Sequence, residues 1–221
     1  FSFLKEYYIQ SLLKKSKGAI VYGKLAEKYL ISLGMDKNKI DIAINTVDTD
    51  YFYSKRKIKK KSIYKLLYIG ELSIRKNVMM LLEAFKILVA NRSDIMLDIV
   101  GSGSEKYNLM NFVRRNKLED HVSFHGFKQK SEIKLFLNKA DCFLFQTEYD
   151  IWGLVLVEAM ASGLPCIASI NAGSTDDLIK EGHNGFKLNF SNYDEFVKKI
   201  NLIINDHNNT QIISNNASKY I

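Results

Sequence analysis

From residue 64 onward, short apolar runs alternate with longer segments in which apolar residues recur at helical spacing. The runs are almost continuously apolar, as expected for a parallel sheet covered on both faces. The pattern therefore predicts an α/β domain. Its strands are expected at residues 64–70, 95–100, 121–126, 141–146, 166–168 and 185–188. Its helices are expected at residues 78–90, 105–116, 131–138, 154–162, 174–180, 193–204 and 210–220, with Ser131 as an N-cap.

A shorter α/β pattern precedes this domain. It predicts a helix, strand, helix, strand and turn over residues 1–15, 18–22, 23–33, 39–44 and 45–52. Six of the seven residues at 55–61 are basic. We expect a solvated linker there, between a first segment ending near residue 53 and a second domain over residues 63–221. A nucleic-acid patch would need interleaved aromatic residues, and an anionic membrane surface is the other alternative.

Composition narrows the class of protein. The chain has 221 residues and a net charge of +8, and no apolar run approaches the ~18 residues of a membrane-spanning helix. It begins with Phe rather than Met, so we expect a fragment. Cys142 and Cys166 both lie in apolar runs, which favours buried free thiols and a reducing compartment over a disulfide or a metal pair.

The stretch 141–169 is the most informative part of the chain. A predicted strand is followed by a polar loop that carries Glu148 and Asp150, and a helix begins at Leu154. Gly163 ends this helix, and the next apolar run follows. In open α/β sheets, ligands bind where a strand's carboxyl end leads into a helix start, and the free N–H groups of that helix favour an anion.

Two carboxylates flank this expected anion site, Asp150 before the helix and Glu158 within it. A carboxylate next to a phosphate would repel it, so both are expected to accept hydrogen bonds from hydroxyl groups. A ligand with a central diphosphate and a sugar at each end fits this arrangement. Nucleotide-sugars have that shape.

The sequence DIWGLVLVE at 150–158, followed by AMASGLP, resembles the signature of retaining glycosyltransferases of family 4, the group 1 glycosyltransferases. That signature is an acid, seven residues, a Glu and then A-x-A-x-G-x-P. The resemblance implies the GT-B fold, in which two Rossmann-like domains face each other across a cleft and the C-terminal one binds the nucleotide-sugar. The first acid is usually Glu and here is the shorter Asp150, with Glu148 as the fallback.

The resemblance extends to both sides of this signature. Asn45, Asp48 and Phe52 match the N-x-x-D-x-x-x-F frame that closes the family's N-terminal domain, so residues 1–53 resemble the tail of a truncated acceptor-binding domain. In the family's G-R-L-x-x-x-K frame an Arg and a Lys bind the diphosphate. Lys76 matches the Lys, whereas Glu71 stands at the Arg position. We expect Arg75 to substitute, because a guanidinium suits phosphate oxygens.

The remaining roles also follow from the resemblance. Glu158 is expected to bind the nucleotide ribose, and the backbone N–H groups of Leu154 and Val155 a phosphate. Asp150 is expected to bind the donor sugar, with the backbone of Trp152 and Gly153 nearby; the Trp152 side chain is a candidate for packing alone.

The base pocket is expected near Phe127 and Lys128, with Gly101 and Gly103 letting the backbone approach. Packing of the Phe127 ring in the hydrophobic core is as good an alternative as stacking on the base. The Gly101-x-Gly103 pair lacks the third Gly of a dinucleotide fingerprint, since Lys106 stands there. An Asp-x-Asp spelling occurs only at 48–50, before the linker, so we expect transfer without a metal.

The resemblance implies a retaining glycosyltransferase that moves a sugar from a UDP- or GDP-linked donor to a sugar, lipid-linked or protein acceptor. The expected setting is cell-surface polysaccharide, glycolipid or glycoconjugate synthesis. We expect a cytoplasmic protein, with peripheral membrane contact as an option, no nucleic-acid partner and no cofactor. The fragment alone is expected to be inactive. Alternatives are an inactive nucleotide-sugar-binding module, a nucleotide-sugar epimerase on the same fold, or an NAD-dependent enzyme, which the broken glycine fingerprint disfavours.

Overall fold

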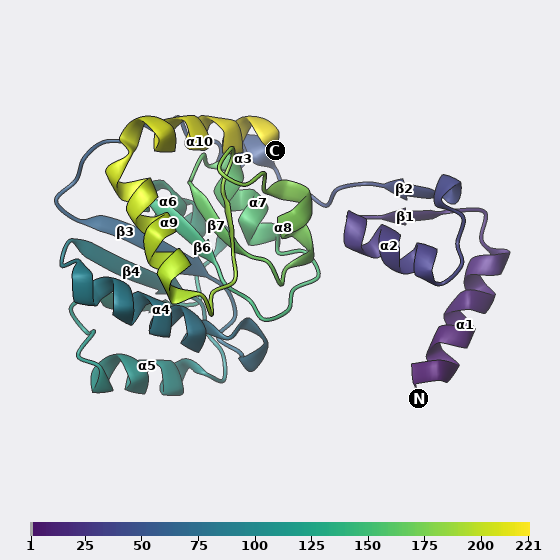
Figure 1. The fold of residues 1–221 in the computed structure, drawn as a ribbon, viewed down its shortest axis with the longest axis horizontal. Helices are drawn as coiled ribbons and strands as arrows, with labels where there is room; N and C mark the ends of the chain where they lie inside the picture. Colours follow the sequence, from purple (N-terminus) through teal and green to yellow (C-terminus); the bar gives the residue numbers. More distant parts are fainter. Residues whose placement is uncertain (1) are drawn as a thin grey trace. The chain divides into compact units, whose positions relative to one another are not determined.

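The computed structural model describes the backbone of residues 2–221 and the side chains of residues 6–221. Phe1, which the sequence places in the first helix, lies outside the described residues. The chain forms two compact units, Phe1–Thr46 and Val47–Ile221, which are described separately (Figure 1). Within residues 2–221, no helix combines the length and apolar content that crossing a bilayer requires.

The second unit is built on a six-stranded parallel sheet with the order β5-β4-β3-β6-β7-β8. Its strands are β3 (Tyr64–Ile69), β4 (Ile95–Val100), β5 (Val122–Gly126), β6 (Cys142–Phe145), β7 (Cys166–Ser169) and β8 (Phe186–Leu188). Strand order reverses between β3 and β6, which is the topological switch point of a doubly wound sheet. The predicted α/β fold, a Rossmann-like parallel sheet, is confirmed.

Helices cover both faces of this sheet, as Figure 1 shows. One core is closed by α4 (Val78–Asn91), α5 (Lys106–Arg115) and α9 (Tyr193–Asn205). The other is closed by α3 (Thr49–Phe52), α6 (Lys130–Lys139), α7 (Leu154–Ala161) and α8 (Gly173–Leu178). The last helix, α10 (His207–Tyr220), contributes Ile213 to the first core and Ala217 to the second.

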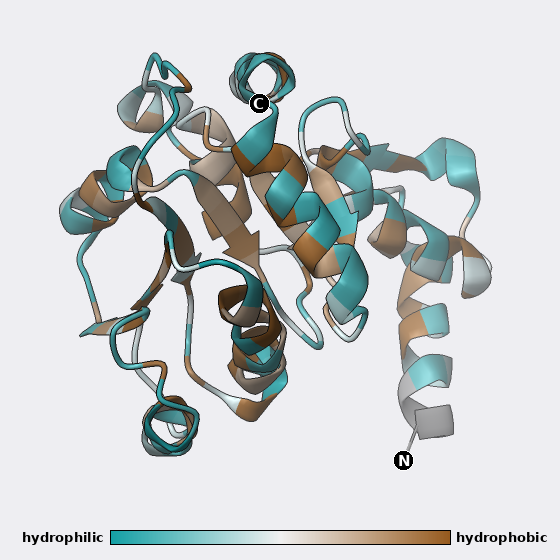
Figure 2. Ribbon diagram, turned by 60° about the vertical axis from the view of Figure 1, so that its left-hand side comes forward, coloured by the Kyte–Doolittle hydropathy of each residue, from teal (hydrophilic) through white to brown (hydrophobic). Residues whose placement is uncertain are grey.

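The strands are continuously apolar because helices pack on both faces of the sheet. In β3, Leu66 and Tyr68 enter the first core while Leu67 and Ile69 enter the second. All four residues are buried, so this part of the strand is continuously apolar instead of alternating between apolar and polar residues. Figure 2 shows the same feature, with hydrophobic strands and with helices that are hydrophilic on one side.

The first unit contains α1 (Ser2–Lys15), β1 (Ala19–Val21), α2 (Lys24–Ser32), the 3-10 turn η1 (Lys37–Lys39) and β2 (Ile40–Ile42). Its two strands pair in parallel. Among its described side chains, the buried hydrophobic residues Val21, Met35 and Ile40 form a small cluster. The helices and strands are those that the sequence predicts within residues 2–44, whereas η1 was not predicted.

The boundary between the units differs from the expected one. Residues 45–52, expected to be a turn, contain α3, and Phe52 is fully buried against α7 in the second unit. Asp48, part of the Asp-x-Asp spelling, caps α3 by accepting a hydrogen bond from the Tyr51 N–H at 3.0 Å. The second unit therefore begins at Val47, and the frame residues Asp48 and Phe52 belong to it.

The basic run is also more structured than a solvated linker. Arg56 donates hydrogen bonds to the backbone carbonyls of Ser162 and Ala140, at 2.8 Å each, and to that of Leu137. These carbonyls lie at or next to the C-terminal ends of α7 and α6, where helices leave acceptors without partners. Arg56 thus joins the ends of two helices.

Two helix starts were predicted incorrectly. The N-cap of α6 is Gln129 rather than Ser131, because Gln129 and Glu132 form a capping box. Helix α10 begins at His207 rather than at residue 210, because Asp206 accepts a hydrogen bond from the Asn209 N–H. Cys142 and Cys166 are buried free thiols, as predicted.

Candidate functional site

Two loops meet at the switch point of the sheet, one after β3 and one after β6. The first contains the 3-10 turn η2 (Ile74–Lys76) and the second spans residues 146–153. The Glu148 N–H donates to the Arg75 carbonyl at 3.0 Å, and the Gln146 amide donates to the Asn77 carbonyl at 3.3 Å. Residues about 70 positions apart in the sequence are therefore held together at one edge of the sheet.

Lys76 and Asp150 form an ion pair across these loops. Their side chains are only 11% and 14% exposed, so each charge depends on the other for compensation. The other carboxylate oxygen of Asp150 accepts a hydrogen bond from the Trp152 N–H at 3.3 Å. The Lys76 ammonium also lies 5.6 Å from the centre of the Phe145 ring. The structure thus brings together two of the residues predicted from the sequence.

Arg75 lies beside this pair. Its guanidinium donates to the Tyr149 carbonyl at 3.0 Å and lies 4.0 Å from an Asp150 carboxylate oxygen. It also lies 3.9 Å from the carboxylate of Glu71, the residue at the position where the family frame has Arg. About half of the Arg75 side chain is exposed, so a ligand can reach it.

Helix α7 begins at the same edge. Its N-cap is Gly153, in a left-handed conformation with φ 88°, and no side chain caps the helix. The N–H groups of Leu154 and Val155 stand in the first turn, where a helix leaves donors unpaired and carries partial positive charge. Leu154 is partly exposed, so this helix start is accessible.

Trp152 has a structural role. Its side chain is buried in the core that includes α7, and its carbonyl accepts a hydrogen bond from the Ser174 hydroxyl. The Trp152 N–H is bonded to Asp150. The packing alternative for this side chain is therefore confirmed, and its backbone orients Asp150.

Glu158 lies further along α7 and is half-buried. Within the part of the chain that the structure describes, no group donates a hydrogen bond to its carboxylate. Burial raises the pKa of Glu158, and the nearby Lys130 ammonium offsets part of this rise. A half-buried acceptor without a donor is suited to bind hydroxyl groups of a ligand.

A cavity of about 430 Å³ adjoins the β3 loop. It is lined at the carboxyl ends of β3, β4 and β5 and from α6 by Ile69, Gly70, Glu71, Val100, Gly101, Ser102, Gly103, Phe127, Lys128 and Ile133. Phe127 is 69% exposed, so its ring is available to a ligand and is not part of the core. The Lys128 ammonium pairs with Glu132 at 3.0 Å. The four residues predicted to surround a base thus line one cavity.

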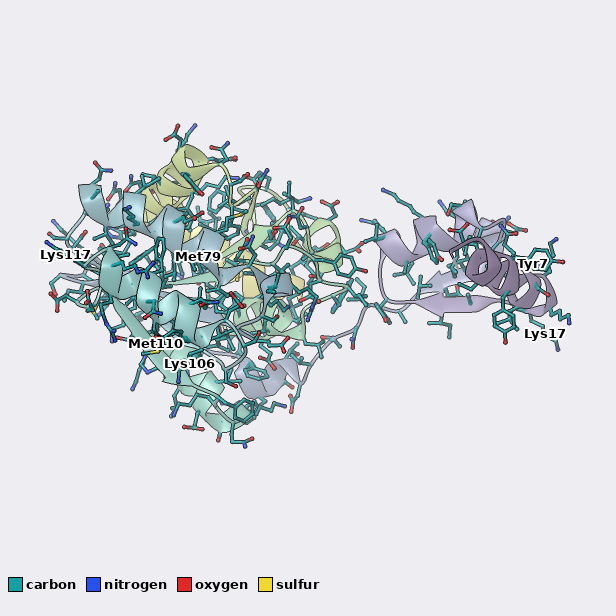
Figure 3. The ribbon with its side chains drawn as sticks, turned by 90° about the horizontal axis from the view of Figure 1, so that it is seen from below. Tyr7, Lys17, Met79, Lys106, Met110 and Lys117 are labelled. Carbon is teal, nitrogen blue, oxygen red and sulfur yellow. The ribbon has the colours of Figure 1, made fainter. Side chains whose placement is uncertain are left out.

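Gly101 and Gly103 are required by contacts between loops. Their φ angles are 143° and 156°, and a Cβ on Gly101 would lie 1.8 Å from the Gly70 carbonyl oxygen. A Cβ on Gly103 would lie 2.4 Å from the Leu72 carbonyl oxygen. These glycines allow the β4 loop to lie against the β3 loop. Helix α5, which follows, directs Lys106 and Met110 toward solvent (Figure 3).

Sequence reasoning missed several residues of this region. Ile133 lines the cavity and Lys130 influences Glu158, but neither belongs to a motif that marks it; Ser102, which also lines the cavity, is the unspecified middle residue of the Gly101-x-Gly103 pair. A larger cavity of about 600 Å³ lies along α9 and β8 and shares no residue with this site. Among the described residues, no group of three or more His, Cys, Asp or Glu side chains could hold a metal ion.

A doubly wound sheet with Arg75, Lys76 and an open helix start at its switch point defines a Rossmann-type ligand-binding domain. A family model described as "Glycosyl transferases group 1" matches residues 51–220. The chain belongs to this family, as the resemblance predicted.

Curated relatives are similar over most of the chain. An uncharacterized glycosyltransferase of Haemophilus influenzae is 29% identical over 175 residues, which cover 79% of this chain and 49% of the relative. The amylovoran biosynthesis glycosyltransferase AmsK of Erwinia amylovora is 29% identical over 169 residues, covering 74% of this chain and 41% of AmsK. The chain thus spans about half the length of the curated relatives it matches.

Solved structures confirm the fold. Anabaena Alr3699/HepE in complex with UDP has a TM-score of 0.87 at 23% identity, covering 99% of this chain and 63% of that protein. The C-terminal domain of the group 1 glycosyltransferase LpcC from Francisella tularensis has a TM-score of 0.69 at 22% identity, covering 79% of this chain and 95% of that domain. The fold is that of GT-B glycosyltransferases, as predicted.

Proposed function

We propose that this chain is the donor-binding part of a glycosyltransferase that moves a sugar from a nucleoside-diphosphate sugar to an acceptor hydroxyl. One observation carries the proposal: Lys76, Arg75 and Asp150 meet beside the uncapped start of α7 at the switch point of the sheet. Cations and free N–H groups at one point suit a diphosphate, and a carboxylate beside them suits a sugar.

The reaction develops negative charge on the diphosphate, next to Lys76, Arg75 and the start of α7. When the bond between the anomeric carbon and the diphosphate breaks, negative charge develops on the leaving oxygen. Lys76, Arg75 and the N–H groups of Leu154 and Val155 stabilise that charge. Because these groups already supply positive charge, we propose that transfer needs neither a metal nor a cofactor.

The rest of the donor occupies the neighbouring groups. The carboxylate of Glu158 accepts hydrogen bonds from the ribose hydroxyls, since no group of the described chain donates to it. The base enters the 430 Å³ cavity, where the exposed ring of Phe127 is available for stacking and Lys128, Gly101 and Gly103 form other parts of the wall. Asp150 binds hydroxyl groups of the donor sugar, with the backbone of Trp152 and Gly153 beside it.

Comparisons guide the choice of substrates to test. Alr3699/HepE and the pneumococcal transferase GtfA were both crystallised with UDP, so UDP-sugars come first and GDP-sugars second. AmsK is named for the biosynthesis of amylovoran, and WcaL for that of colanic acid, which supports a cell-surface saccharide as acceptor. We propose a cytoplasmic location, in contact with the membrane where the acceptor is lipid-linked.

Stereochemistry is proposed from the signature at 150–165. We propose retention of the anomeric configuration. The acceptor hydroxyl attacks on the face from which the diphosphate leaves, and the diphosphate takes its proton. Product analysis by NMR on the full-length enzyme would test this, and an inverted anomeric product would overturn it.

Binding is the first test of the function. The thermal midpoint of the 221-residue chain should rise with UDP, or with GDP, and not with NAD. Ligand at ~100 times its dissociation constant should add roughly 2.7 kcal/mol to the free energy of unfolding. Full-length enzyme should transfer sugar in the presence of EDTA. Loss of all activity in EDTA would contradict metal independence, and no response to any nucleoside diphosphate would contradict the proposed function.

A further inference from the structure

We infer that Asp150 makes the site discriminate between a nucleotide-sugar and the bare nucleoside diphosphate, by competing with the diphosphate for Lys76. The inference rests on the proposed function. It assigns to Asp150 a second role beyond binding the sugar, namely that of counter-ion to Lys76. It also links two events, sugar binding and release of the lysine.

The competing contact is the ion pair itself. One carboxylate oxygen of Asp150 is paired with the Lys76 ammonium, and the other accepts the Trp152 N–H and lies 4.0 Å from Arg75. Both oxygens are therefore engaged by groups of the protein. The side chains of Lys76 and Asp150 are almost fully buried, so water compensates little of either charge.

The backbone holds Asp150 in place. Its carbonyl accepts the Gly173 N–H at 2.9 Å, and its N–H donates to the Asn171 carbonyl at 3.4 Å. Lys76 is anchored by its own N–H, which donates to the Ser73 carbonyl at 3.0 Å. Because both backbones are fixed, an exchange of partners requires movement of only the lysine side chain.

A bare diphosphate meets a penalty at this pair. If the Lys76 ammonium turns toward the phosphates, Asp150 loses its close counter-ion and keeps only the more distant Arg75, at 4.0 Å, while further negative charge lies nearby. If Lys76 stays on Asp150, the diphosphate lacks part of its compensation. Either arrangement weakens binding of the nucleotide alone.

A sugar on the diphosphate removes this penalty. Its hydroxyl groups donate hydrogen bonds to Asp150 in place of the lysine, which leaves Lys76 free to bind the phosphates. After transfer the sugar is gone, Asp150 recovers Lys76, and the diphosphate product is held less tightly. The same pair therefore favours capture of the donor and release of the product.

The test compares affinities by isothermal titration calorimetry. The ligands are UDP and UDP-glucose, or GDP and GDP-mannose if the wild type responds only to guanosine. We expect Asp150→Asn to bind the bare diphosphate about tenfold more tightly than the wild type and to bind the nucleotide-sugar with unchanged affinity. The preference for the sugar-bearing ligand should therefore be lost. Asp176→Asn is the matched control, because Asp176 is also paired with a lysine, Lys187 at 2.6 Å, but its side chain is exposed to solvent.

A further variant separates competition for Lys76 from simple charge repulsion. In a Lys76→Met background, Asp150→Asn should change affinity for the bare diphosphate little, because there is no lysine left to release. An undiminished tenfold effect in that background would overturn the inference, as would Asp150→Asn with unchanged or weaker diphosphate binding. A wild type that binds no nucleotide would overturn the proposed function as well, so the two failures are distinguishable.

Discussion

Gly153 lies directly against the ring of Phe145: a Cβ at this glycine would come within 2.2 Å of the Phe145 Cζ atom. The Lys76 ammonium lies 5.6 Å from the centre of the same ring. The last residue of β6 therefore sets the position of both the α7 start and the lysine. Only a residue without a side chain fits at the start of α7, and its φ of 88° adds a second reason for glycine.

We expect Gly153→Ala to destabilise the domain and to weaken UDP binding, because the new methyl group must displace the Phe145 ring or the helix start. Gly182→Ala is the matched control. Gly182 also has a positive φ, 68°, but no atom lies within 4 Å of its Cβ position. The control should lose only about 1–2 kcal/mol for the left-handed conformation. Equal losses in chemical denaturation for both variants would contradict a role for the Phe145 contact.

Glu158→Gln should have opposite effects on stability and on binding. Burial raises the pKa of Glu158, so the folded state disfavours the ionised carboxylate. Replacing this carboxylate by a neutral amide should therefore raise the thermal midpoint of the free protein at pH 7. Ribose binding should weaken, because an amide accepts fewer hydrogen bonds than a carboxylate. Thermal shifts with and without UDP measure both effects. Glu119→Gln, on the exposed surface, should leave both unchanged.

The same group gives a pH dependence. Because the pKa of Glu158 is raised in the folded protein, stability is greater where the group is protonated and falls as the pH rises through that pKa. Nucleotide binding should have the reverse dependence, since the ionised carboxylate is the better acceptor. UDP affinity should therefore decline on acidification at a higher pH than an ordinary Glu would cause. Glu158→Gln should remove this decline, and an unchanged pH profile in that variant would contradict it.

Strands and loops at the switch point were predictable because their signals are local. The strand β3 is buried on both faces and is therefore an apolar run of strand length in the sequence. The signature at 150–158 marks the loop after β6 and the start of α7 directly. Pairings between distant residues were not predictable. Nothing in the sequence shows that Arg56, the one arginine in a run with five lysines, binds the ends of two helices, or that Lys76 and Asp150 are partners. These contacts depend on how distant segments approach each other.

Arg56→Met should cost on the order of 3 kcal/mol of unfolding free energy. Its guanidinium serves three carbonyls at or next to the ends of α6 and α7, and buried acceptors without a donor cost about 1–3 kcal/mol each before relaxation. Burial lowers the pKa of Arg56 to about 10, so the group remains charged at neutral pH. Urea unfolding measures the loss. Lys60→Met removes an exposed cation from the same run and should cost little; equal losses would show that only the charge of the run matters.

Strand β8 forms one edge of the sheet, and charged side chains occupy its outward backbone groups. The Glu181 carboxylate accepts the Lys187 N–H at 2.7 Å, and the Lys199 ammonium donates to the Lys187 carbonyl. Lys199 also pairs with Glu181 and Glu195, at 2.9 and 2.8 Å. An edge with occupied donors and acceptors is protected from pairing with another chain.

Lys199→Ala should remove this protection. The Lys187 carbonyl loses its donor, and the two carboxylates lose the cation between them, so Glu181 should move away and expose the Lys187 N–H as well. We expect greater self-association than in the parent protein, increasing with concentration, in sedimentation velocity. Lys198→Ala is the matched control, because Lys198 is the adjacent lysine on α9 and is exposed. If Lys199→Ala and Lys198→Ala self-associate to the same extent at all concentrations tested, Lys199 and Glu181 do not protect this edge.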